Sequence, residues 1–263
     1  MESREAPALV HVGRSALEGS IARYANTFDL LEVAGERGRH PRRPGLLEWR
    51  RLVGPEFVFS VVVPASVSAL EAGAKADELL AHARMVADAL GAAWWLLKTP
   101  MTVTPSTRAL RELEAVVASL RAEGRRIAWE PRGVWGDEGS LRAANQLGIH
   151  LVRDLAVEDP LGDSDVIYTR LRALGAGARI GAAAAERVAE RLEEAAEACV
   201  IVEGTGGGRV RQVLREMLGA GAAAGSLHDD DDDDDEGEGE GEGEGDEAEY
   251  SDEDEGDIQG DEE

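Results

Sequence analysis

The sequence predicts an α/β fold, a TIM-barrel-like (βα)8 single domain that is followed by a disordered acidic C-terminal tail. Short apolar runs rich in Val, Ile and Trp alternate with longer segments of helical spacing, which is typical of parallel βαβ units. Eight such runs occur, a number that favours a closed barrel over an open doubly wound sheet. A third observation, the dense acidity of residues 229–263, predicts the tail.

The expected strands are near-continuous apolar runs, which indicate strands buried on both faces by surrounding helices. In chain order they are Leu9–Gly13, Leu30–Ala34, Phe57–Val63, Ala93–Lys98, Arg126–Arg132, Ile149–Leu155, Val166–Arg172 and Cys199–Gly204.

The expected helices carry recognisable start and stop signals. Ser106 is a suitable N-cap, and Gly91, Gly124 and Gly148 follow three helices where a left-handed residue is favoured. A loop replaces a helix between the sixth and seventh strands. The helices are Leu17–Thr27, Pro44–Leu52, Lys75–Leu90, Ser106–Glu123, Glu138–Leu147, Ala182–Ala198 and Gly207–Leu218.

Charge is distributed unevenly along the chain, and this distribution predicts a folded body followed by an acidic tail. The net charge is −25, yet residues 229–263 hold 23 Asp or Glu and no Lys or Arg, which leaves 30 acidic and 28 basic residues elsewhere. Such a tail buries too little apolar surface to offset about 1–2 kcal/mol of backbone ordering per residue. We therefore expect a flexible N-terminus at 1–8, the barrel at 9–219, a Gly/Ala linker at 220–228 and the disordered tail at 229–263.

Composition gives further expectations about the core residues and about the location of the protein in the cell. Cys199 is the only cysteine, so neither an internal disulfide nor a Cys-rich metal site is expected, and we interpret this thiol as a small core residue. Trp94 and Trp95 should pack on opposite sides of one strand. The N-terminus has no apolar leader and no window reaches 18 uninterrupted apolar residues, so the sequence predicts a cytoplasmic protein without a membrane span.

Polar residues gather in the C-terminal halves of the expected strands, the end at which barrels hold their active sites. Side chains alternate along a strand, so Glu130 and Arg132 share a face, as do Tyr168, Arg170 and Arg172. Two interpretations stay open: a pocket for an anionic or hydroxylated small molecule, or a structural ion-pair network. In the first, Glu130 and Asp154 are candidate general acids or bases, and the candidate ligand-binding residues are Glu32, Arg132, Tyr168, Arg170, Arg172 and Glu203.

Other features give weaker expectations. The glycines Gly206, Gly207 and Gly208 precede the last helix and could form an anion-binding loop or simply a flexible turn. The carboxylates at the strand ends could hold Mg²⁺ or Mn²⁺, but interleaved arginines and the absence of histidine argue against a metal, so no cofactor is expected. The five histidines have no metal-ligand spacing. The basic segment Arg37–Arg43 could meet an anionic partner or the acidic tail, but a solvated loop is favoured.

Several stretches in the body occur in an order that is informative together: His11–Gly13, Tyr24–Val33, Trp49, Phe57–Pro64, Trp129–Trp135, Asp154 and Tyr168–Arg172. They resemble the YecE-like family, barrel proteins grouped as domain of unknown function 72. The resemblance implies a barrel with a polar pocket at the C-terminal ends of the strands and implies no known reaction. The matching polar residues are Glu32, Glu130, Arg132, Asp154, Tyr168 and Arg170.

The departures from the family pattern are equally informative. A family lysine in the third strand is Val62 here, and two family histidines are Gly133 and Arg172. Two functions therefore stay in view: binding or conversion of an unknown small polar or anionic molecule, phosphorylated ligands included, and a non-catalytic interaction protein with a degenerate barrel. In the second, the tail engages basic partners or serves solubility. Nucleic acid is an unfavoured partner because the body is near neutral and the tail repels phosphates.

Overall fold

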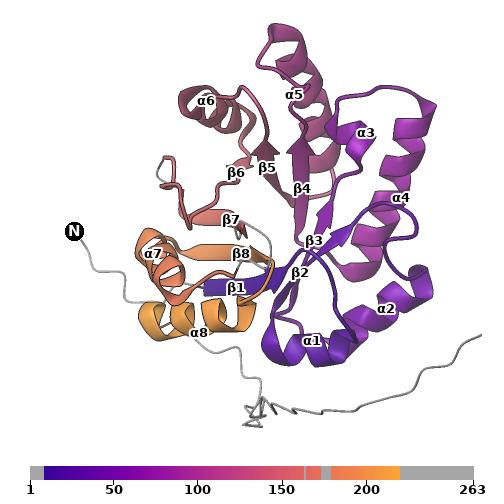
Figure 1. Cartoon of the computed structure of the whole chain (residues 1–263). Coiled ribbons are helices and arrows are strands. Elements are labelled where there is room, and N and C mark those ends of the chain that lie inside the picture. Colours follow the sequence, from indigo (N-terminus) through magenta and orange to yellow (C-terminus); the bar gives the residue numbers. More distant parts are fainter. Residues whose placement is uncertain (1–8, 163, 173–178, 220–263) are drawn as a thin grey trace, which may run out of the picture. The chain divides into compact units, whose positions relative to one another are not determined.

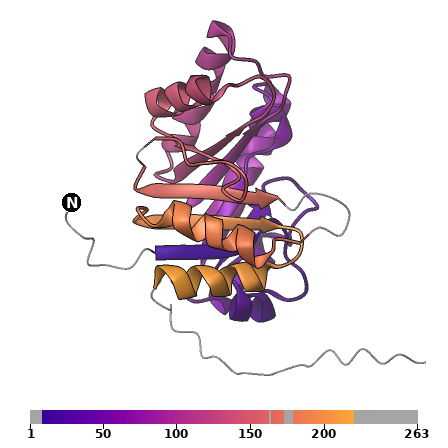
Figure 2. The same cartoon turned by 60° about the vertical axis from the view of Figure 1, so that its left-hand side comes forward.

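The computed structural model describes residues 9–162, 164–172 and 179–219, and Figures 1 and 2 show their arrangement. The predictions for residues 1–8, 220–228 and 229–263 lie outside these ranges.

Eight parallel strands form a nearly closed barrel, which confirms the predicted fold class (Figure 1). The order around the sheet is β6-β5-β4-β3-β2-β1-β8-β7. Strands that follow one another in the sequence are therefore paired, except β6 and β7 at the two ends of the sheet, and β1 pairs with β8. The strands are β1 (Leu9–Arg14), β2 (Leu30–Ala34), β3 (Val58–Val62), β4 (Trp94–Thr99), β5 (Arg126–Pro131), β6 (His150–Leu151), β7 (Val166–Arg172) and β8 (Glu197–Glu203).

Helices cover the outside of the barrel, as Figures 1 and 2 show. They are α1 (Ile21–Thr27), α2 (Arg43–Leu52), α3 (Ala65–Ser68), α4 (Ala74–Leu90), α5 (Thr107–Arg121), α6 (Asp137–Leu147), α7 (Ala182–Leu192) and α8 (Gly207–Leu218). The predicted N-cap is confirmed, because Ser106 Oγ accepts a hydrogen bond from Ala109 N at 3.2 Å. Gly91 and Gly148 end α4 and α6 in the left-handed region with φ of 58° and 59°. No helix in the described part is long and apolar enough to cross a membrane.

Two clusters of apolar side chains lie on the two sides of the strands. The larger one joins the outer faces of the strands to the helices, and the smaller one fills the barrel. Trp94 belongs to the inner cluster and Trp95 to the outer one, which confirms that the two side chains lie on opposite sides of β4. Cys199 is fully buried beside Trp94 and Tyr168 in the inner cluster, as a core residue should be. This packed interior forms the floor beneath the strand ends.

The barrel closes between β6 and β7 by one isolated parallel bridge, from Arg153 to Thr169. Arg153 O accepts hydrogen bonds from Arg170 N at 3.2 Å and from Thr169 Oγ1 at 2.8 Å. The prediction of a long sixth strand, Ile149–Leu155, is therefore wrong. The chain turns at Asp154, whose carbonyl accepts from the N–H groups of two later residues, so the backbone leaves the sheet at this point.

Other elements also differ from the expectation, most of them by one or two residues at an end. The helix predicted over Ala182–Ala198 ends at Leu192, because Glu197 already pairs with β1 and β7 as the first residue of β8. The short helix α3 follows Pro64 and was not predicted. The helix predicted from Leu17 begins at Ile21, since Ser20 Oγ accepts from Arg23 N and caps it there. The segment between β6 and β7 contains no helix among its described residues, as predicted.

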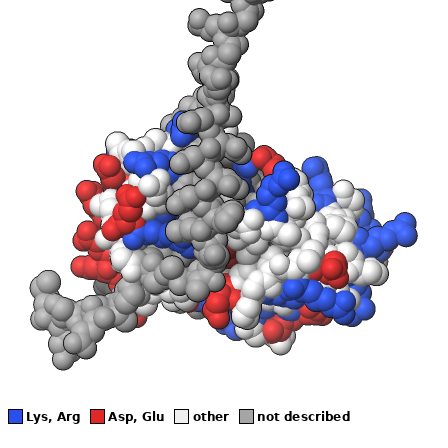
Figure 3. All heavy atoms as spheres, turned by 90° about the horizontal axis from the view of Figure 1, so that it is seen from below, with Lys and Arg blue, Asp and Glu red and all other residues white. Residues whose placement is uncertain are grey.

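The surface of the body carries charges of both signs. In the view from below, basic and acidic side chains lie among uncharged ones on the described part of this face (Figure 3). This mixture agrees with the near balance of acidic and basic residues outside the tail.

Candidate functional site

A large cavity opens at the C-terminal ends of the strands. Its volume is about 800 Å³, and its wall combines apolar side chains with charged ones. The charged residues that line it are Glu32, Glu36, Arg39, Lys98, Arg132, Arg170 and Glu203. A cavity of this size accommodates a small organic molecule.

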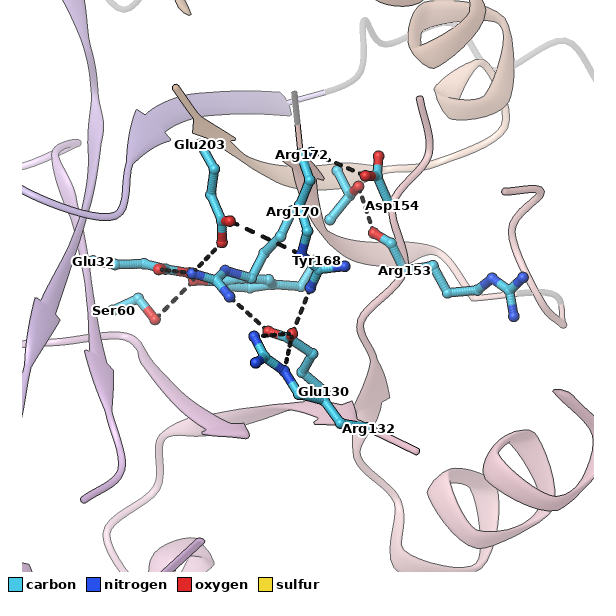
Figure 4. A network of polar contacts seen from close by, with 11 residues as sticks. Glu32, Ser60, Glu130, Arg132, Arg153, Asp154, Tyr168, Arg170, Arg172 and Glu203 are labelled. Carbon is cyan, nitrogen blue, oxygen red and sulfur yellow. Dashed lines mark hydrogen bonds and ion pairs between the residues drawn. The ribbon is translucent and has the colours of Figure 1, made fainter. Parts of the chain in front are cut away.

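Arg170, on β7, is the centre of the charged network at the base of this cavity (Figure 4). Its guanidinium lies 3.0 Å from Glu32 Oε2, 2.6 Å from Glu130 Oε2 and 2.7 Å from Glu203 Oε1. These carboxylates come from β2, β5 and β8, so strands far apart in the sequence converge on one cation. The Arg170 side chain is only 3% exposed. Alternation along the strands therefore does bring the predicted residues together at one rim.

Glu130 accepts from three arginines. Besides Arg170, its Oε1 accepts from Arg172 and from Arg132, whose Nε and Nη2 lie at 3.2 Å. Burial alone would raise the pKa of Glu130, but Arg170 and Arg172 outweigh it and hold the pKa below its usual range. Glu130 is thus a carboxylate at neutral pH. It can accept a proton or orient a cation, and it is poorly suited to donate a proton.

Glu32 and Tyr168 form the deepest layer of the network. The Tyr168 hydroxyl donates to Glu32 Oε1 at 2.9 Å and lies 3.0 Å from Ser60 Oγ. All three side chains are buried, with Tyr168 fully enclosed. Burial raises the pKa of Glu32, and Arg170 opposes this by favouring its charged form. The layer couples β2, β3 and β7 directly below the cavity.

The Glu130→Gln substitution should cost about 1–3 kcal/mol of unfolding free energy at neutral pH, since it weakens buried hydrogen bonds to charged groups. A lowered folded-state pKa stabilises the protein fully above the unfolded pKa of about 4.3. This contribution disappears as the pH falls through the lower folded pKa. Urea unfolding of both proteins from neutral to acidic pH should therefore show a difference that shrinks with acid. A difference that grows instead would contradict the assignment of Glu130 as an ionised anchor.

Asp154, the second candidate acid or base, lies in the seam between β6 and β7. Its Oδ2 accepts from Arg172 N at 2.9 Å and its Oδ1 from Ala156 N at 3.0 Å. Burial raises its pKa, and these two backbone donors oppose that rise. The side chain is 5% exposed and lines neither of the two cavities at the rim. The carboxylate takes the place of ladder bonds where the sheet is interrupted, and it positions the backbone of Arg172.

The predicted anion-binding loop lies outside the cavity wall. Gly206 has a φ of 95°, and a Cβ there would meet Ile180 O at 2.7 Å. A Cβ on Gly207 would meet the Phe28 ring at 2.9 Å. Packing therefore accounts for these two glycines, whereas a Cβ on Gly208 would make only an ordinary contact with the Thr27 side chain at 3.9 Å. Anion binding by Gly206–Gly208 remains a prediction.

Several residues of the cavity wall were not predicted as site residues, and Lys98 and His40 are the two that bear most on its chemistry. Lys98 lines the cavity from β4, and its position at the end of a predicted strand was a usable signal. His40 lines the wall from the basic segment, and its Nε2 lies 3.2 Å from Nε2 of His82 on α4. The two histidines are 42 positions apart, so no spacing rule could reveal this pair.

A second cavity of about 380 Å³ lies on the other side of Arg132. Arg132 lines both cavities and is 51% exposed, whereas Arg172 lines only the smaller one. Arg153 faces the smaller cavity and pairs with Asp137 at 2.9 Å. Of the network arginines, Arg132 is therefore the one best placed to meet a ligand.

The carboxylates at the rim surround a guanidinium and do not form an open cluster. Glu32, Glu130 and Glu203 all bond to Arg170, while Asp154 bonds to backbone N–H groups. Within the described ranges, no group of three or more His, Cys, Asp or Glu is arranged to hold a metal ion. The donors present do not fit a Mg²⁺ or Mn²⁺ site.

No protein-family model and no curated protein matches the sequence. Solved structures do match. A DUF72 family protein from Enterococcus faecalis has a TM-score of 0.62 at 16% identity, with 81% of this chain and 99% of that chain covered. A DUF72 family protein from Thermotoga maritima has a TM-score of 0.59 at 16% identity, with 80% and 99% covered.

The chain has the fold of DUF72 family proteins. The barrel implied by the resemblance to domain of unknown function 72 is thereby confirmed. Membership of the YecE-like family itself stays a prediction, because identity this low shows the fold alone. A D-tagatose 3-epimerase-like protein shares the fold more distantly, with a TM-score of 0.55 at 16% identity and coverage of 80% of this chain and 97% of that chain.

Proposed function

We propose that this barrel binds, or acts on, a small polar molecule that carries an anionic group, in the cavity at the C-terminal ends of its strands. The observation that carries the proposal is an excess of positive charge on the cavity wall. Three carboxylates line it, Glu32, Glu36 and Glu203, against four cations, Arg39, Lys98, Arg132 and Arg170. A ligand carboxylate or phosphate would balance that excess.

The remaining bonding capacity of the wall supports the same ligand class. The buried carboxylates are already paired with Arg170 and its neighbours, and Glu36 Oε1 accepts from Ala65 N at 3.1 Å. In contrast, the Arg132 guanidinium is half-exposed and bonds only to Glu130 among the described residues. Its outward N–H groups can donate to a ligand.

We assign the rim residues different roles within this proposal. Arg132 contacts the anionic group, and Lys98 adds a positive charge to the same cavity wall. Glu130 orients the arginines and is the candidate general base. Asp154 is a positioning residue that acts through the backbone of Arg172. Glu32, Tyr168 and Arg170 form the rigid floor that fixes the others, since their side chains are buried and bonded to one another.

The names of two proteins that share this fold are in keeping with a hydroxylated ligand. Solved structures that share this fold include the D-tagatose 3-epimerase-like protein and a xylose isomerase domain protein from Planctomyces limnophilus, at 16% and 11% identity. Barrels also often bind phosphate near the last strands. Sugar phosphates are therefore the first ligands to try.

A thermal-shift screen of the full-length chain against phosphate, sugar phosphates, carboxylates and divalent metals tests the proposal. A ligand at 100 times its Kd adds about 2.7 kcal/mol, which for a domain of this size raises Tm by roughly 5–10 °C. We expect such a shift with a phosphate or carboxylate ligand and expect Arg132→Ala to abolish it. The Arg132→Ala protein should still fold, because Glu130 keeps Arg170 and Arg172 as partners.

The degenerate-barrel alternative predicts another outcome. If no ligand shifts Tm, and Arg132→Ala and Glu130→Gln both melt above the wild type, the rim charges are a relic that no longer meets a partner. That result would favour the interaction role, whose proposed acidic tail lies outside the described residues.

A further inference from the structure

Lysine is rare in this chain. Of its 28 lysines and arginines, only Lys75 and Lys98 are lysines. Lys75 is exposed near the start of α4, whereas Lys98 is half-buried and lines the large cavity. A guanidinium keeps its proton at neutral pH, while a lysine amine can lose it and become a nucleophile. The chain thus places one of its two side-chain amines at the site where such chemistry could be used.

The strand fixes where Lys98 points. Trp94 and Leu96, four and two positions earlier, belong to the cluster inside the barrel, so Lys98 continues the inward-facing row of β4. In the sheet register Lys98 lies directly opposite Glu130 of β5. The side chain therefore rises from the barrel floor into the cavity beside the charged network.

The Lys98 amine has no ionic partner in the described part of the chain, although acidic residues surround it. The Glu130, Glu32 and Glu203 carboxylates are held by Arg170, and Glu130 also by Arg172. The arginines thus occupy the carboxylates that would otherwise pair with the amine and keep it protonated.

The surroundings also increase the fraction of the Lys98 amine that is neutral and able to attack, although the protonated form still contributes positive charge to the wall. Burial lowers the pKa of Lys98, and the nearby Arg170 and Arg132 guanidiniums lower it further. Glu130 and Glu32 act in the opposite direction without reversing the shift. Glu203, Glu36, Arg39 and His40 complete the charged or titratable wall of the same cavity.

We propose that Lys98 is a nucleophilic amine that forms an imine with the carbonyl group of the bound ligand, which makes the ligand an anionic aldehyde or ketone. The inference rests on the proposed function, since Arg132 must hold the anionic group. The Nζ lone pair forms a bond to the carbonyl carbon, and the carbon–oxygen bond then breaks. The oxygen leaves as water with the two protons of the neutral amine, and no oxidant or reductant is consumed.

Pyridoxal 5′-phosphate, an aldehyde with a phosphate group, is a suitable probe. The full-length chain is incubated with it at neutral pH and reduced with borohydride, and peptide mapping measures the label at each amine. We expect Lys98 to be labelled severalfold faster than Lys75, which serves as an internal control for an ordinary exposed lysine. Inorganic phosphate should slow labelling at Lys98 and leave Lys75 unchanged.

The variant Lys98→Arg keeps the positive charge at this position but removes the nucleophilic amine, so it distinguishes the two roles. It should lose the label at position 98 and keep the thermal shift produced by phosphate. Equal labelling of Lys98 and Lys75, or stronger labelling of Lys75, overturns the inference; if phosphate still raises Tm, the proposed function survives. Preferential labelling that phosphate does not slow supports the nucleophile and counts against the anion site.

Discussion

Replacing Arg170 with methionine should lower the unfolding free energy by about 3–5 kcal/mol, because the substitution leaves buried carboxylates without a counter-charge. Arg170 is the one cation that contacts Glu32, Glu130 and Glu203 together among the described residues, and its side chain is 3% exposed. Burial would lower the pKa of Arg170, but the three carboxylates raise it well above its ordinary value. The guanidinium is therefore the charged centre on which the rim is built.

Urea unfolding of the wild type, Arg170→Met and Arg172→Met measures this effect. Arg172 is 37% exposed, and its removal leaves Glu130 with Arg170 and Arg132, so we expect a loss of only about 1 kcal/mol. The loss for Arg170→Met should shrink in acid as the stranded carboxylates take up protons. Equal losses for the two variants would show that Arg170 is not the centre of the network.

Substituting Gly13 with alanine should destabilise the protein by more than about 4 kcal/mol, or prevent folding, because no space exists for the added methyl group. A Cβ at Gly13 would lie 1.8 Å from Leu30 O, a backbone atom that side-chain rotation cannot move. Gly13 pairs with Leu30 in the register of β1 and β2. Forcing these strands apart would also displace Glu32, two residues further along β2, from Arg170.

Gly139→Ala provides the matched control for this prediction. Gly139 lies in α6 with nothing within 4 Å of its ideal Cβ position, so alanine should stabilise the helix by about 0.5–1 kcal/mol. Thermal unfolding of the two variants should give changes of opposite sign. A Gly13→Ala protein that is as stable as the wild type would contradict the close approach of β1 and β2.

Much of the site follows from the two-residue period of a strand. From the sequence alone, that period places Glu130 with Arg132 and Tyr168 with Arg170 on one face of their strands. The same period places Lys98 on the same face of its strand as Trp94, so the direction of the Lys98 side chain could have been predicted in the same way. Strand order alone then predicts that these side chains meet at one rim.

Other features depend on contacts that the sequence does not encode locally. The segment around Asp154 is apolar enough in sequence to predict a strand. Only the closure of the barrel shows that the sheet is interrupted there and that the Asp154 carboxylate replaces the hydrogen bonds between strands. The ionisation of Glu130 reflects Arg170 and Arg172 on another strand, β7. The glycines before α8 suggested a phosphate loop, whereas packing against Phe28 and Ile180 already accounts for Gly207 and Gly206.

Isothermal titration calorimetry with inorganic phosphate and ribose 5-phosphate can measure whether an anionic small molecule binds in the cavity at the strand ends, where Arg132 and Lys98 supply positive charge. The titrations compare the wild type, the double variant Lys98→Met Arg132→Ala, and Arg142→Ala, which removes an exposed arginine of α6 as a control. We predict equal binding to the wild type and the control, and binding at least about tenfold weaker, or about 1.4 kcal/mol, to the double variant. Equal binding to all three proteins, or no binding to the wild type, would contradict the proposed function of the cavity.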